Sequence, residues 1–228
     1  MVFGILAGLA SAAVSVVSTA VSSIGPAVSG FCASVLPRIV PVLSTGMQVL
    51  SAVGQIARGV LSAVGVFRPE EKIDEMGERA LQGADQGVKP ENYDSTGQYI
   101  QALRELKIDP EKSAQWDDIQ KTVAGLAIGS KGLEEKLNMP EGAAGNLWVL
   151  ATANPGYFHA DRLGSLLNHT HDIASVVRYF DGQLNLSDTV RVGDTLVQAE
   201  RSLAPEKPEK TILKELDQAE ADFLRHAP

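Results

Sequence analysis

The sequence predicts an all-α protein in two unlike parts: an N-terminal hydrophobic helical hairpin with small-residue seams, and a C-terminal acidic multi-helix domain. Charge is divided unevenly, because residues 1–69 hold three arginines and no Asp or Glu, which gives +3, whereas the remainder carries −11. Small and polar residues recur in the apolar part every three or four positions, which is a helical period. A chain that separates apolar from charged residues in this way has parts suited to two environments.

The spacing of small residues decides between helix and strand for residues 2–66. Valine and serine favour a strand by propensity, but a strand repeats every two residues, and these residues step alternately by four and three. We expect them to face another helix or the water inside a pore. The two stripes are Gly4, Gly8, Ser11, Ser15, Ser18, Ser22, Gly25 and Ser29, and then Ser44, Gln48, Ser51, Gln55, Arg58 and Ser62.

Proline and glycine divide this apolar segment. Gly25 and Pro26 predict an interruption, because proline lacks a backbone donor and disfavours helix at the preceding residue. Pro37 and Pro41 predict a turn between them. The predicted helices are 3–24, 26–36 and 42–66. The first and the last have the roughly 20 residues that a helix needs to cross the hydrocarbon core of a bilayer.

The charged remainder is typical of short amphipathic helices. An apolar face recurs in residues 70–82, and Ser95 or Thr96 is a suitable N-cap for the next helix. Residues 189–192 are the one candidate for a short strand. Two further helix starts are Asp109-Pro110-Glu111, which leads toward Leu126, and Met139-Pro140-Glu141, which leads toward Leu150.

The last part begins with a charged linker that contains prolines and leads into an amphipathic helix over 209–225. The predicted division is therefore 1–68 for the hairpin, 69–204 for the acidic helical domain, and 205–228 for the linker and the final helix.

Catalytic and metal-binding patterns are weak. His159, His169 and His171 lie near Asp161 and Asp172, but zinc enzymes more often place two histidines four residues apart on one helical face. We therefore predict no metal site. Cys32 is the only cysteine, so no intrachain disulfide can form, and we expect a buried, inert thiol.

Other candidate motifs favour ordinary structural roles. Residues 125–132 (GLAIGSKG) lack the Gly-Lys-Ser/Thr order of a phosphate-binding loop, and we interpret them as a helix C-terminus capped by glycine. The adjacent carboxylates at 117–118 and 134–135 point about 100° apart on a helix and are expected to be solvated. The acidic part has no basic patch with interleaved aromatics, which argues against direct nucleic-acid binding. We predict a protein that is not an enzyme and has no cofactor or small-molecule substrate.

The apolar segment predicts a membrane-active protein. In this interpretation the hairpin inserts into a bilayer and oligomerises, as in a virion or phage membrane-penetration or ejection component, or a delivered pore-former. Small residues allow the close helix packing on which association in lipid depends. Serine and glycine lower the gain from insertion, because Val, Leu and Ile each favour the bilayer by only a few tenths of a kcal/mol. The expected location is a membrane, a virion or a secreted particle.

A second interpretation keeps the hairpin out of lipid. A helix that is apolar on most sides is also found in the core of a large assembly, so the chain could be a structural subunit of a virion or tail-like particle. Its partners would then be other subunits rather than a bilayer, and copies of itself in either case. A third interpretation, a disordered Ala/Ser/Val tract, conflicts with the regular spacing.

Overall fold

The computed structural model describes residues 2–226, and the side chains of residues 11–225. In this range the chain forms thirteen α-helices and two short 3-10 helices without a strand, which confirms the all-α prediction. The α-helices are α1 (Val2–Ser22), α2 (Ser29–Ser34), α3 (Leu36–Leu43), α4 (Met47–Ala63), α5 (Ile73–Asp85), α6 (Thr96–Glu105), α7 (Pro110–Ser113), α8 (Asp118–Lys136), α9 (Asn146–Ala153), α10 (Ala160–His169), α11 (Ile173–Phe180), α12 (Leu186–Leu203) and α13 (Glu209–His226). The 3-10 helices are η1 (Pro26–Val28) and η2 (Pro90–Asn92).

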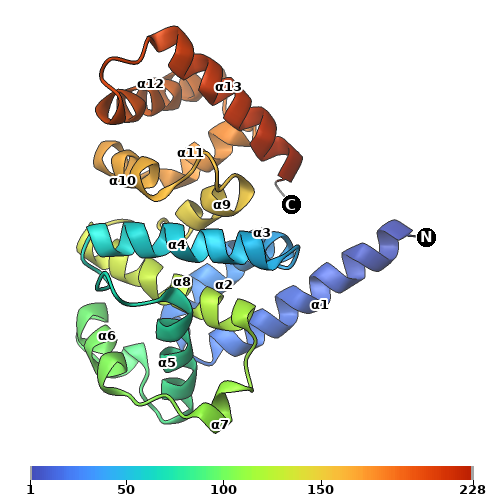
Figure 1. The fold of residues 1–228 in the computed structure, drawn as a ribbon, viewed down its shortest axis with the longest axis vertical. Helices are drawn as coiled ribbons and strands as arrows, with labels where there is room; N and C mark the ends of the chain where they lie inside the picture. The colour runs from blue at the N-terminus through green and yellow to red at the C-terminus, as the bar shows by residue number, and fades with distance from the viewer. Residues whose placement is uncertain (1, 227–228) are drawn as a thin grey trace.

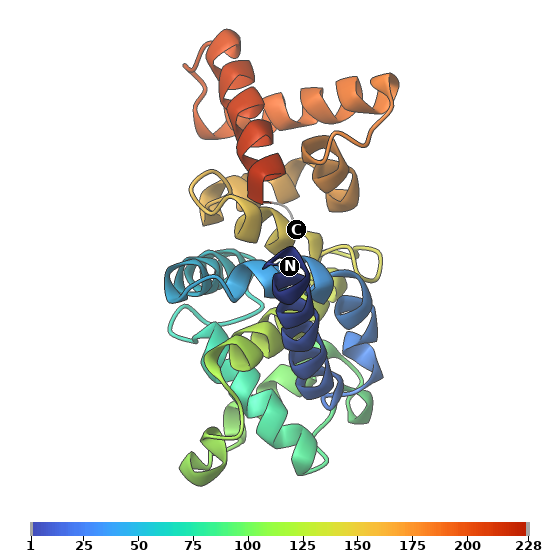
Figure 2. The ribbon, with the colours of Figure 1, turned by 90° about the vertical axis from the view of Figure 1, so that its right-hand side faces the viewer.

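The apolar segment lies across the middle of the molecule. Helices α3 and α4 separate α5–α8 on one side from α9–α13 on the other (Figures 1 and 2). Helix α4 contacts α8, α9 and α10, while α3 contacts α1 and α9. Buried apolar side chains from Val17 to Phe223 form one continuous core. The predicted two-helix hairpin is not confirmed, because α1 packs mainly on α3 and α8, whereas α4 packs on α8, α9 and α10.

The predicted turn from Pro37 to Pro41 is wrong. Both prolines lie inside α3, and the chain turns after it, at residues 44–46. Pro37 is in the first helical turn, where a missing N–H costs nothing. Pro41 removes one internal hydrogen bond, but Leu36 and Ile39 of the same helix are completely buried. Their burial holds the helix together across the proline. The break at Gly25-Pro26, by contrast, is confirmed.

Helix starts in the charged part follow the sequence only in part, and the predicted start at Met139-Pro140-Glu141 is wrong, because α9 begins at Asn146. Ser95 accepts a hydrogen bond from the Gln98 N–H and caps α6, as predicted. Asp109 caps only the single turn α7, and a new helix, α8, starts at a capping box formed by Asp117 and Gln120. The candidate strand 189–192 is helical and lies within α12.

Glycines bring α5 and α8 into close contact. A Cβ on Gly77 would lie 1.8 Å from the Lys121 carbonyl oxygen, and one on Gly125 would lie 2.0 Å from the Ile73 carbonyl oxygen. The interpretation of residues 125–132 as a helix C-terminus is therefore wrong, since these glycines lie inside α8, which continues to Lys136. They allow neighbouring backbone and side chains to approach, at the cost of helix propensity.

Candidate functional site

Helix α1 is attached to the body through its C-terminal half. Val17 and Val21 are buried against the core, whereas Ser15, Val16 and Thr19 on the other face are exposed. The N-terminal end of the α1 ribbon extends away from the body (Figure 1). The helix has 21 residues and none of them is charged. A long helix without charge that extends from a protein surface is unusual, because exposed surfaces are normally rich in charged residues.

Both predicted stripes face away from the core of this chain. The exposed members are Ser11, Ser15, Ser22, Ser29, Ser44, Gln48, Ser51, Gln55 and Arg58, and the half-buried ones are Ser18, Gly25 and Ser62. Gly4 and Gly8 lie outside the described side chains. The buried residues of α1 and α4 occupy the opposite faces. The stripes are therefore available to other molecules, and their role in helix packing or in lining a pore stays a prediction.

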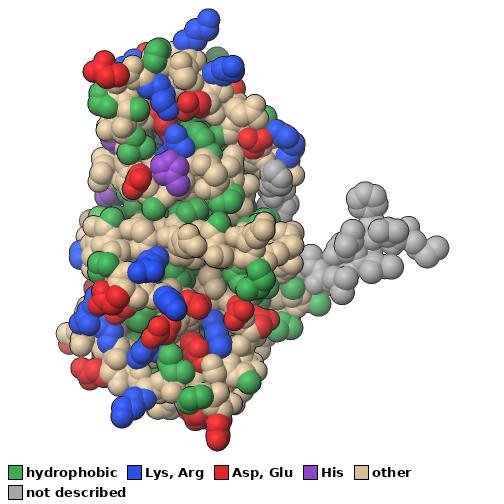
Figure 3. Space-filling view, viewed as in Figure 1, with side chains coloured by type: hydrophobic (Ala, Val, Ile, Leu, Met, Phe, Trp, Pro, Cys, Tyr) green, Lys and Arg blue, Asp and Glu red, His purple; other side chains and the backbone are tan. Residues whose placement is uncertain are grey.

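The surface over α3 and α4 carries little charge. Figure 3 shows acidic and basic side chains gathered on either side of this band, where α5–α8 and α9–α13 lie. The band follows from the sequence, since the segment before Pro69 has no acidic residue. It is about one helix wide, roughly 10 Å, whereas a hydrocarbon core is about 30 Å thick. The band is thus too narrow to hold the folded body within a bilayer.

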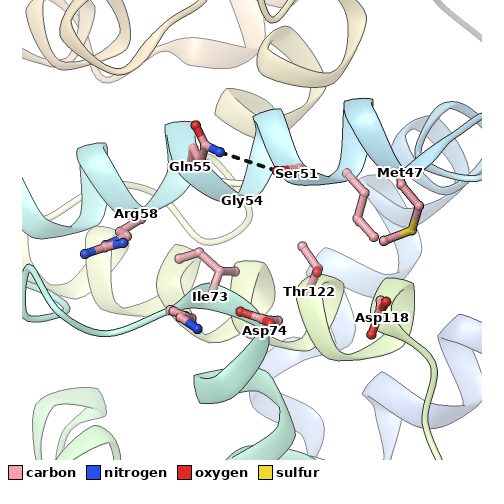
Figure 4. Close-up of a pocket in the computed structure, with 11 residues that line it drawn as sticks. Met47, Ser51, Gly54, Gln55, Arg58, Ile73, Asp74, Asp118 and Thr122 are labelled. Carbon is pink, nitrogen blue, oxygen red and sulfur yellow. Dashed lines mark hydrogen bonds between the residues drawn. The ribbon is translucent and has the colours of Figure 1, made fainter.

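The second stripe borders a pocket of about 400 Å³ between α4, α5 and α8. Figure 4 shows α4 on one side of it and the first turns of α5 and α8 on the other. Buried Leu50 and Ile73 provide apolar lining. Gln55 donates a hydrogen bond to the Ser51 hydroxyl at 3.4 Å, and the Arg58 guanidinium donates to the Pro69 carbonyl at 2.7 Å.

Charges of both signs surround this pocket. Asp74 and Asp118 lie opposite the N-terminal half of α4, whereas Arg58 lies toward its C-terminal end (Figure 4), and Lys72 also lines the pocket. None of these four forms an ion pair with a described residue. Sequence reasoning identified only Arg58. The aspartates each lie in a first helical turn, where acidic residues stabilise the helix dipole, and only the packing of three helices brings them together. The lining therefore presents two carboxylates and two cationic side chains to the pocket.

A serine–lysine pair elsewhere resembles a nucleophile and its base. Lys121 Nζ lies 3.1 Å from Ser113 Oγ. However, Lys121 also forms an ion pair with Glu78 at 3.3 Å, and the Ser113 hydroxyl donates a hydrogen bond to the same carboxylate. The Glu78 carboxylate thus contacts both groups, and the three side chains come from α5, α7 and α8. These side chains therefore join α7 to α5 and α8 as a structural clamp.

The candidate histidines lie at the two ends of α10 and just before α11. His169 bonds through Nδ1 to the Ser165 carbonyl at 2.8 Å and through Nε2 to the Ser202 hydroxyl at 3.1 Å. His159 precedes α10 and His171 precedes α11. Within the described residues, no cluster of three or more His, Cys, Asp or Glu side chains is arranged to hold a metal ion.

Two other sequence interpretations need correction. Glu134 is not solvated, because it is 5 % exposed and accepts a hydrogen bond from the Ala144 N–H at 3.3 Å. Cys32 is only half-buried, and its burial raises the pKa of the thiol, while a hydrogen bond from Ser22 opposes that rise.

Among residues 11–225, whose side chains the structure describes, no single helix is both long and apolar enough to cross a bilayer, and the described part of α1, Ser11–Ser22, is a shorter apolar helix. One pair, Pro26–Ser34 with Leu36–Leu43, reaches that length and apolarity together but is bent by 67°. The expectation for the second long helix is wrong, since α4 has 17 residues and contains Gln48, Gln55 and Arg58. Searches of protein-family models, curated proteins and solved structures found no match to this chain.

Proposed function

We propose that this chain is a non-enzymatic, membrane-active protein and that α1 is the helix that enters the bilayer. The observation that carries this proposal is a helix without charge that is attached at one end and exposed along one face. Residues 29–63 stay in the body, because leaving it would expose the buried faces of α3 and α4 to water. A virion or phage penetration component, or a delivered pore-former whose α1 helices associate, fits this description.

The alternative is a structural subunit of a large particle, in which α1 packs on protein. One observation favours it: most of the apolar segment, in α3 and α4, is already buried by other helices of the same chain. Under both proposals the exposed face of α1 is the surface that another molecule buries. They differ in whether lipid or protein provides it, and the same experiment can separate them.

The experiment is flotation of the full chain with phosphatidylcholine vesicles. Ala12 is exposed and lies at the midpoint of α1, so Ala12→Asp tests insertion without disturbing the core. An aspartate at the centre of an inserted helix costs about 2.5–3.5 kcal/mol, which predicts a loss of vesicle affinity of roughly 100-fold. The matched control is Ala174→Asp, because Ala174 is exposed in the first turn of α11, where an acidic residue is favourable.

Membrane insertion predicts that the wild type and Ala174→Asp float with the vesicles and that Ala12→Asp does not. If the wild type does not bind vesicles, or if Ala12→Asp binds as well as the wild type, the membrane proposal is wrong. Failure to bind vesicles together with self-association that Ala12→Asp abolishes would support the structural subunit instead.

A further inference from the structure

Exposed apolar side chains gather on α12 and α13. Seven large apolar side chains are exposed in the described range, and five of them belong to these two helices: Leu186, Val190, Leu203, Leu213 and Leu224. Leu186 is 82 % exposed. Figure 2 shows the N-terminal half of α12, which carries Leu186 and Val190, extending beyond α13. The chain itself leaves this surface uncovered.

A groove of about 370 Å³ runs between the two helices and is here called the α12–α13 groove. Its apolar lining is Tyr179, Val190, Val197 and Leu213, together with Gly193. Gly193 lies against the Tyr179 ring, since a Cβ at this position would be in van der Waals contact with the ring at 3.6 Å. Leu186 precedes Val190 by one helical turn and extends the same apolar face.

Charged residues also line the groove. Arg201 and Glu209 border the groove and form an ion pair with each other, so they add no net charge. Asp194 is the other charged residue of the lining and is exposed. A helix without charged side chains can therefore lie over Val190 and Leu213 without burying an unpaired charge of its own.

We propose that, when no membrane is present, α1 of one copy docks in the α12–α13 groove of a second copy. Helix α1 is neutral throughout, and Val16 on its free face is 56 % exposed. At 1.5 Å per residue, the part of α1 before buried Val17 is about 22 Å long and α12 is about 27 Å long, so the free part of α1 can lie along α12. The inference uses the same helix as the proposed function but concerns the protein without lipid.

Pairing of two α1 helices is the competing arrangement, and it buries less apolar surface. The described free face of α1 offers one large apolar side chain, Val16, among Ser, Ala and Thr. The groove offers valine, leucine and tyrosine side chains to the same face, so docking there removes more apolar area from water. Such an interface joins two different surfaces of the chain, and it therefore produces a closed ring or an open filament.

The test is sedimentation velocity of the full chain without lipid, over a range of protein concentrations. Val16→Glu alters the docking helix and Val190→Glu alters the groove; both positions are more than half exposed, so folding is retained. Met47→Glu and Leu224→Glu are matched controls, because these side chains are also more than half exposed and lie outside the proposed contact. A buried glutamate in an apolar contact should weaken association at least about tenfold.

The proposal predicts that the wild type and both controls associate, whereas Val16→Glu and Val190→Glu are each monomeric. An equal mixture of these two variants should form a dimer, since one supplies an intact groove and the other an intact α1. A monomeric wild type overturns the proposal. So does association of Val190→Glu at wild-type strength, which is the result that pairing of two α1 helices predicts.

The outcome is separable from that of the proposed function. Val190→Glu leaves α1 unchanged, so it should still float with phosphatidylcholine vesicles if α1 enters the bilayer. A wild type that associates but does not bind vesicles would support docking and contradict membrane insertion. A wild type that binds vesicles but stays monomeric in their absence would support membrane insertion and contradict docking.

Discussion

The contact between α5 and α8 predicts that replacing either of two glycines by alanine destabilises the fold. In an exposed helix the same change stabilises, by up to about 1 kcal/mol. Here the new methyl group of Gly77→Ala would lie 1.8 Å from the Lys121 carbonyl oxygen, and that of Gly125→Ala 2.0 Å from the Ile73 carbonyl oxygen. Both neighbours are backbone atoms, so no side-chain rotation relieves the clash, and the helices must separate.

The size of the effect follows from that separation. A normal contact of about 3.4 Å requires the two helices to move apart by roughly 1.5 Å, which loosens packing along their whole interface. Overpacking of this kind costs about 3 kcal/mol. With a urea m-value of about 2 kcal/mol/M, the unfolding midpoint should fall by about 1.5 M.

The assay is urea unfolding followed by far-UV circular dichroism, with Gly164→Ala as the matched control. Gly164 lies inside α10 and a Cβ there would meet nothing within 4 Å, so this variant should be as stable as the wild type or slightly more so. The double variant Gly77→Ala/Gly125→Ala should lose less than the sum of the single losses, because the helices separate only once. Unchanged or increased stability of Gly77→Ala would refute the reasoning.

Two further predictions concern buried charges. The Arg162 guanidinium donates hydrogen bonds to the Glu200 carboxylate, one of them from Nη2 at 3.0 Å, and Glu200 is 3 % exposed. Arg162→Met leaves that carboxylate buried without its partner and should therefore lower the free energy of unfolding, measured in urea, by about 3–5 kcal/mol. The double variant Arg162→Met/Glu200→Leu should lose less stability, and an equal loss in both variants would contradict the argument. Burial raises the pKa of the Glu134 carboxyl despite the opposing ion pair with Lys131. The folded state therefore binds the carboxyl proton more tightly than the unfolded state does. The stability that comes from this protonation is lost as the pH rises through the folded pKa. Glu134→Gln should consequently gain stability relative to the wild type as the pH rises from about 4.5, the ordinary pKa of glutamate, through the folded pKa, and a pH-independent difference between the two proteins would contradict this cause.

The sequence by itself determined the helical class and several helix ends. These features depend on hydrogen bonds between residues three or four positions apart, so a local pattern contains the necessary information. The cap at Ser95, the interruption at Gly25-Pro26, and the last helix, predicted over 209–225, were accessible for that reason. The alternation of small residues by four and three also identified helix correctly against the β-propensity of valine and serine.

The tertiary structure alone decided which faces are covered. Pro41 stays inside α3 because helices far away in the sequence bury its neighbours, and local helix propensity does not include the free energy of that burial. The pocket beside α4 combines Arg58 with Lys72, Asp74 and Asp118 from other elements. Gly77 has its role only because the Lys121 carbonyl lies against it. Packing between residues far apart in sequence depends on the whole arrangement of helices, which periodicity along one helix cannot specify.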